Sequence, residues 1–107
     1  MDSWQPVIDF DDVIEGGINK AEMDGRKLIL LLAEGELFVY EDACPHEGHP
    51  LSLGELEGEV LTCTKHLWEF DVRTGKHVSR IHRPKCDLRS FRARVVDGMV
   101  QVELPEA

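Results

Sequence analysis

The sequence predicts an all-β fold, an antiparallel sandwich or barrel, and three observations lead to that prediction. Turn-forming glycines recur at short intervals along the chain, from Gly16-Gly17 to Asp97-Gly98. Between them lie short stretches rich in β-branched, aromatic and leucine residues. No stretch shows a sustained helical period, and no internal repeat is present. Short strands joined by tight turns are expected to pack as layers of β-sheet.

The expected elements follow in chain order. "FDDVIEGG", Phe10–Gly17, predicts a single helical turn with Asp9 or Asp11 as its cap. Apolar segments flank "AEGE" and predict a hairpin with a short loop. The remaining expected strands before the C-terminal hairpin are Val60–Cys63, Trp68–Val72 and His77–Ile81.

"FRARVVDGMVQVEL", Phe91–Leu104, is the clearest hairpin. Phe91, Ala93 and Val95 alternate with arginines in the first half, and apolar residues alternate again in the second. Asp97-Gly98 between the halves is a typical two-residue hairpin turn.

Length and composition restrict the class of protein. A chain of 107 residues is expected to form a single domain over residues 1–107. Its net charge of −9 disfavours nucleic acid and anionic membranes, and suits either a partner with a basic patch or simple solubility. The longest apolar run, Leu28–Ala33, is too short to span a bilayer, and the acidic N-terminus does not resemble a signal peptide. We therefore expect a cytoplasmic protein.

Two short motifs contain the residues with metal-binding chemistry. Cys44 and His46 are separated by one residue in a loop rich in proline and glycine, and Cys63 and His66 are separated by two. Sixteen residues lie between the two motifs, and each motif follows an expected strand. The odd number of cysteines, three, disfavours a disulfide framework and favours metal or redox use.

The donor set allows two kinds of metal site. Two thiolates and two imidazoles suit tetrahedral zinc, although zinc sites usually begin with two cysteines two to four residues apart. One cysteine followed by one histidine in each loop suits a binuclear [2Fe–2S] centre better, because one iron takes both thiolates and the other takes both imidazoles.

These motifs support a family resemblance. C44-P-H46 and C63-T-K-H66 resemble the paired cluster-binding motifs of Rieske proteins, and "LSLGELEGEVLTC" and "FDVRTG" resemble the soluble Rieske ferredoxins of bacterial oxygenases. The resemblance implies a Rieske fold with a cluster-binding subdomain at about residues 42–86. It also implies one [2Fe–2S] cluster per chain, with the cysteines on one iron and the histidines on the other. Such a protein is an electron carrier and not itself an enzyme.

The resemblance also implies partners. Electrons would come from an NADH-dependent flavoprotein reductase and pass to an oxygenase hydroxylase component. The sequence His66-x-Trp68 resembles the ferredoxins of soluble di-iron monooxygenases that act on aromatic or alkene hydrocarbons. The alternatives are the ferredoxin of a ring-hydroxylating dioxygenase, the Rieske-like small subunit of a reductase, and a structural zinc module. We expect a monomer.

Residues near the ligand motifs have secondary expectations. Trp68 is either a core residue or a docking anchor, and Pro84 stiffens a loop that covers the cluster. His49 either shapes the partner surface or the potential, or is simply solvated. Cys86 is expected to be a small buried residue. High-potential Rieske proteins have bridging cysteines and a serine where this chain has His49, Lys65 and Trp68, so we expect a potential in the lower part of the family range.

Overall fold

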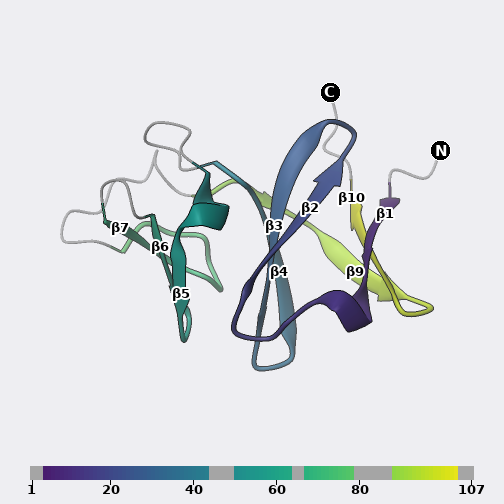
Figure 1. Cartoon of the computed structure of the whole chain (residues 1–107), viewed down its shortest axis with the longest axis horizontal. Helices are drawn as coiled ribbons and strands as arrows, with labels where there is room; N and C mark the ends of the chain where they lie inside the picture. Colours follow the sequence, from purple (N-terminus) through teal and green to yellow (C-terminus); the bar gives the residue numbers. More distant parts are fainter. Residues whose placement is uncertain (1–3, 44–49, 64–66, 79–87, 104–107) are drawn as a thin grey trace.

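The computed structural model describes residues 4–43, 50–63, 67–78 and 88–103 (Figure 1). In these residues the chain forms ten strands and two 3-10 turns, so the predicted all-β fold is confirmed. The strands are β1 Trp4–Asp9, β2 Ile18–Met23, β3 Arg26–Ala33, β4 Glu36–Glu41, β5 Glu55–Glu57, β6 Val60–Cys63, β7 Trp68–Asp71, β8 Ser90–Phe91, β9 Ala93–Val96 and β10 Met99–Glu103; the turns are η1 Phe10–Asp12 and η2 Leu51–Leu53. No helix among these residues has the length and apolar character that crossing a bilayer requires.

The strands form three antiparallel sheets. Their strand orders are β1-β10-β9, β2-β3-β4-β8 and β5-β6-β7. Figure 1 shows the β5–β7 sheet at one end of the molecule, β2, β3 and β4 in the middle, and β1, β9 and β10 at the other end. In the sequence, residues 44–49 lie between β4 and η2, and residues 64–66 lie between β6 and β7, so the second ligand motif begins in the β5–β7 sheet.

Strand β3 explains the long apolar run of the sequence. Leu28–Leu32 is buried throughout, and successive side chains of a strand point to opposite faces. The even-numbered residues pack into a core with β1, β9 and β10, whereas the odd-numbered residues pack into a second core with β6, β7 and η2. A strand covered on both faces needs apolar residues at every position, which is why the run does not alternate.

The C-terminal hairpin forms as predicted at its turn and differs at its start. Asp97 and Gly98 have φ values of 51° and 78°, as a primed two-residue turn requires. The first half of the predicted hairpin is divided between two sheets, because Phe91 pairs with Val39 of β4 while β9 pairs with β10. The chain therefore passes from one sheet to the other at Arg92.

Two other expected elements are shorter than the sequence indicated. The helical turn is limited to η1, and although Asp9 occupies its N-cap, its side chain makes no capping hydrogen bond. The strand expected at His77–Ile81 contributes one isolated bridge, between His77 and Phe70, and its residues from 79 onward lie outside the described part of the chain.

A cluster of polar contacts joins the β5–β7 sheet to the central sheet. The Arg73 guanidinium, just after β7, contacts Glu34 at 3.2 Å, Glu36 at 3.0 Å and Glu59 at 2.8 Å. Glu34 lies in the β3–β4 turn, Glu36 begins β4 and Glu59 lies in the β5–β6 turn, so this cation connects its own segment after β7 to two others.

A buried tyrosine makes a second connection between the same two sheets. The Tyr40 hydroxyl of β4 donates a hydrogen bond to the carbonyl oxygen of Val72. Burial, reinforced by the negative charge of Asp71, raises the pKa of Tyr40 from 10.0 to about 12.

This tyrosine predicts a fall in stability at alkaline pH. The unfolded chain loses the tyrosine proton near pH 10 and the folded chain near pH 12, so the free energy of unfolding declines as pH rises through this window. In Tyr40→Phe we expect this decline to be absent, and the lost hydrogen bond to cost about 1–2 kcal/mol at neutral pH. Chemical denaturation at several pH values measures both. The chain has one tyrosine, so its absorbance titration reports Tyr40 alone, and a midpoint near 10 would contradict the prediction.

Candidate metal centre

The predicted thiolate ligand Cys63 ends strand β6 on the inner face of its sheet. Its side chain is 1% exposed and forms no disulfide. It shares a core with Leu61 and Phe70, and Trp68 of β7 is its partner in the strand register. The thiolate form of cysteine is a metal ligand, so Cys63, at the end of the strand that leads into the second motif, is a candidate ligand.

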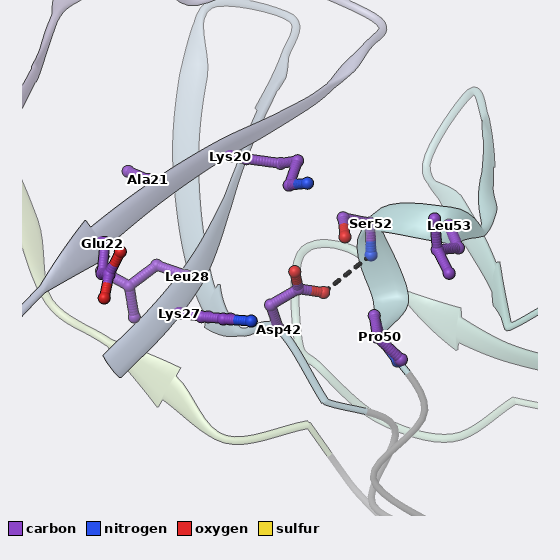
Figure 2. Close-up of a pocket in the computed structure, with 9 residues that line it drawn as sticks. All are labelled: Lys20, Ala21, Glu22, Lys27, Leu28, Asp42, Pro50, Ser52 and Leu53. Atoms are coloured by element: carbon purple, nitrogen blue, oxygen red, sulfur yellow. Dashed lines mark hydrogen bonds between the residues drawn. The ribbon is translucent and has the colours of Figure 1, made fainter. Parts of the chain in front are cut away.

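A hydrogen bond joins the two ends of the segment that contains the first ligand motif. The Ser52 backbone N–H donates to the carboxylate of Asp42 at 2.7 Å (Figure 2). Asp42 precedes residues 44–49 and Ser52 follows them, and Asp42 is itself buried. Its backbone N–H donates to Lys27 on β3 at 2.9 Å. The base of the first loop is thus attached to the central sheet.

Gly54 brings this same base against the strand that leads to Cys63. A Cβ atom at Gly54 would lie 2.2 Å from the backbone oxygen of Thr62, a distance at which the two atoms would clash. Thr62 is the residue before Cys63. The end of the first loop and the start of the second are therefore in backbone contact, and only glycine permits this approach.

A groove of about 450 Å³ lies between β2, β3 and the base of the first loop (Figure 2). Lys20 and Lys27 extend into it from the β2–β3 hairpin, whereas Pro50, Ser52 and Leu53 form the opposite wall. Glu22 and Asp42 also line it, so cationic and anionic side chains are balanced there.

The residues that follow the second motif face in different directions. Leu67 has a positive φ of 56° and its side chain is 71% exposed. Trp68 is half-buried, packs against the core that contains Cys63, and stacks on His77 with ring centroids 4.4 Å apart. The aromatic side chain therefore turns inward, and its leucine neighbour turns outward.

His77 is a residue to which the sequence analysis assigned no role. The structure buries it beside Trp68 and Phe70. The sequence alone does not indicate this contact, because a two-residue turn at Thr74-Gly75 would place position 77 opposite position 72. In the structure the turn spans residues 72–74, and His77 lies opposite Phe70.

Most of the other predicted site residues lie outside the described part of the chain. These are Cys44, His46, His49, His66, Pro84 and Cys86. Within the described ranges no group of three or more histidine, cysteine or acidic residues is placed to hold a metal ion. The structure thus describes one predicted ligand, Cys63, together with the segments that flank the other three.

The sequence matches the family model of the Rieske [2Fe-2S] domain over residues 3–92. The chain belongs to the Rieske [2Fe–2S] domain family. The family's centre has the same donor set as the two motifs, and the free, buried thiol of Cys63 suits a thiolate-bound iron. The residues present therefore fit a [2Fe–2S] cluster, and the zinc alternative is set aside.

Relatives of this Rieske protein are components of oxygenase systems. The ferredoxin component of the naphthalene 1,2-dioxygenase system of Pseudomonas putida is 34% identical over 73 residues, covering 68% of this chain and 70% of that protein. The ferredoxin component of the alkene monooxygenase system of Xanthobacter autotrophicus is 31% identical over 93 residues, covering 86% of this chain and 74% of that protein.

Solved structures agree with the Rieske fold. A chain of the complex of reduced oxygenase and oxidized ferredoxin in carbazole 1,9a-dioxygenase superposes with a TM-score of 0.81 at 30% identity, covering 96% of this chain and 94% of that chain. NdmA of Pseudomonas putida CBB5 also gives a TM-score of 0.81, at 21% identity. The match covers 95% of this chain and 34% of that larger chain, so this likeness concerns the fold alone.

These findings give the protein its chemical class. It is a Rieske ferredoxin with a [2Fe–2S] cluster as cofactor, an electron-transfer component rather than a catalytic enzyme. Substitution of two glycines tests whether the backbone contact between Gly54 and Thr62 organises the cluster site.

We expect Gly54→Ala to disturb the cluster and Gly17→Ala to leave it intact. The new methyl group at position 54 collides with the backbone of β6, at a cost on the order of 3 kcal/mol. At Gly17 the nearest atoms are 3.6 Å away, an ordinary contact. Iron and sulfide content and the thermal midpoint measure the effect. Equal occupancy in the two variants would show that the contact between Gly54 and Thr62 does not organise the site.

Proposed function

We propose that this ferredoxin carries single electrons from an NADH-dependent flavoprotein reductase to the oxygenase component of a system that oxidises aromatic or alkene hydrocarbons. The observation that carries the proposal is the intact pair of Cys/His motifs, one of whose cysteines, Cys63, is free and buried at the end of β6. The names of the relatives, with both dioxygenase and monooxygenase systems among them, support this role.

The proposed ligands divide by charge between the two irons. Cys44 and Cys63 hold one iron through thiolates, and His46 and His66 hold the other through neutral imidazoles. When bound, the cluster accepts and releases one electron. Imidazoles in place of two thiolates make the centre less negative, which favours the added electron relative to an all-cysteine cluster. Packing around Cys63 keeps water from the thiolate side, so electrons enter and leave on the histidine side.

Leu67 is the proposed anchor for the partner protein. A leucine in the left-handed region costs about 1 kcal/mol, and an exposed apolar side chain adds nothing to the core. Both features occur at the residue after the proposed ligand His66, where a docking surface has to lie for electron transfer. We assign Trp68 to the packing behind this surface, His49 to its rim, and Pro84 to the loop that covers the cluster.

Two kinds of oxygenase remain candidates for the electron acceptor. A soluble di-iron hydroxylase is favoured by the His66-x-Trp68 sequence and by the alkene monooxygenase relative. A ring-hydroxylating dioxygenase is favoured by the naphthalene 1,2-dioxygenase relative. Identities of 31% and 34% do not separate them. We further propose that the protein works as a monomer in the cytoplasm, between its two partners.

Spectra of ligand variants test the proposed ligand set. The purified protein is expected to be red-brown and, after dithionite reduction, to give a rhombic EPR signal of low average g. Cys63→Ser and His66→Ala are expected to lose this signal, and Cys86→Ser to keep it. We expect a potential in the lower part of the range of about −150 to +300 mV. A colourless protein, or a cluster retained in Cys63→Ser, would contradict the assignment of the ligands. A potential well above zero would contradict the expected low potential, which rests on His49, Lys65 and Trp68 standing where high-potential Rieske proteins have bridging cysteines and a serine.

Reconstitution with purified components tests the partner. With NADH and a flavoprotein reductase, we expect this ferredoxin to support substrate oxidation by the hydroxylase of a di-iron hydrocarbon monooxygenase. Turnover only with a ring-hydroxylating dioxygenase would assign it to the second class, and turnover with neither would overturn the proposed role.

The same assay tests the docking anchor. We expect Leu67→Ala to slow electron transfer to the oxygenase roughly fivefold, because an interface anchor is worth more than 1 kcal/mol. Ile14, which is 68% exposed and follows η1, provides a matched control, and Ile14→Ala should leave the rate unchanged. Equal rates in the two variants would exclude Leu67 as the anchor.

A further inference from the structure

His77 is an imidazole buried beside two aromatic side chains, Trp68 and Phe70. It is 3% exposed, whereas its neighbours Lys76 and Val78 are exposed. Both neighbours are tied to β7 by backbone hydrogen bonds. The Asp71 N–H donates to the Lys76 oxygen at 2.9 Å, and the Val78 N–H donates to the Glu69 oxygen at 2.8 Å. The backbone thus fixes position 77 with its side chain toward the core.

The His77 ring packs against two aromatic rings of β7. It lies nearly parallel to the Trp68 indole, with centroids 4.4 Å apart and an interplanar angle of 24°. It also meets Phe70 in a tilted arrangement, with centroids 5.5 Å apart. Such offset stacks of flat rings contribute about 0.5–1.5 kcal/mol beyond the area they bury.

Trp68 connects this stack to two of the proposed metal ligands. Trp68 is the direct cross-strand partner of Cys63, and β7 begins at Trp68, two residues after His66. A side chain that fixes the indole therefore fixes the strand start from which the chain leaves His66. It also fixes the ring that lies across from the Cys63 thiolate.

Hydrophobic burial alone does not require a flat ring at this position. A flat ring is needed to stack on the indole, which a branched aliphatic side chain does not provide. The shape of the ring, rather than its burial alone, is the feature that matters at position 77.

We propose that His77 is a positioning residue for the cluster: by stacking on Trp68 it holds the start of β7, and with it the Cys63 and His66 side of the site, in the geometry that binds the cluster. The proposal rests on the proposed ligand set. Groups that orient metal ligands without touching the metal typically change metal affinity by 10–100-fold when they are replaced.

A pair of variants of similar volume tests this role. His77→Phe keeps a flat ring on Trp68, and His77→Leu fills the space without one. In the cluster-loaded protein we expect His77→Phe to match the wild type in EPR g values and reduction potential. We expect His77→Leu to shift both and to lose its cluster roughly tenfold faster. Neither measurement involves a partner protein, so the outcome is independent of which oxygenase is the acceptor.

Leu30→Ala provides the control for a merely structural role. Leu30 is fully buried in the other core, with β10, and its truncation should lower the thermal midpoint without changing g values or potential. If His77→Leu behaves like Leu30→Ala, His77 is an ordinary core residue and the proposal is wrong. If His77→Phe shifts the potential as much as His77→Leu, the ring nitrogens rather than the stacking are responsible, and the proposal is also wrong. A cluster retained in Cys63→Ser would instead overturn the ligand set itself.

Discussion

The burial of β3 on both faces is the constraint on which the rest of the structure depends. Leu28–Leu32 supplies alternate side chains to two separate cores, one with β1, β9 and β10 and the other with β6 and β7. Strand β4 follows the same rule, since Val39 belongs to the first core and Tyr40 to the second. The central sheet thus contributes side chains to both cores, and the sheet that contains Cys63 packs against one of its two faces.

Contacts between described residues hold together the chain segments next to the two ligand motifs. Asp42 and Ser52 close the first segment, and Gly54 lets its end touch the backbone before Cys63. Arg73 connects the far side of the same sheet to the β3–β4 connection through Glu34 and Glu36, and it also contacts Glu59 in the β5–β6 turn. Electron transfer requires little movement of the ligands between oxidation states, and a site held at its base by backbone contacts suits that requirement.

The fold was predictable where local patterns and tertiary packing agree. The Asp97-Gly98 turn and the alternating residues after it formed as expected, because a primed turn and a half-buried strand each leave a clear sequence pattern. Strands β1, β2 and β5 were not predicted. Their sequences, "WQPVID", "INKAEM" and "ELE", are mixed in polarity, and pairing with a neighbouring strand rather than intrinsic preference makes them strands. The division of Phe91–Val96 between two sheets likewise has no local signal.

The sequence by itself determined the chemistry of this protein. Two Cys/His motifs at this separation identify the cluster family without coordinates, because metal preference depends on the donor atoms and their spacing. The tertiary structure alone decided which neighbours face the core. Leu67 points outward and Trp68 inward, and the imidazole of His77 lies on that indole. Residue type does not encode these directions, since they follow from strand register and from the turn that brings position 77 opposite position 70.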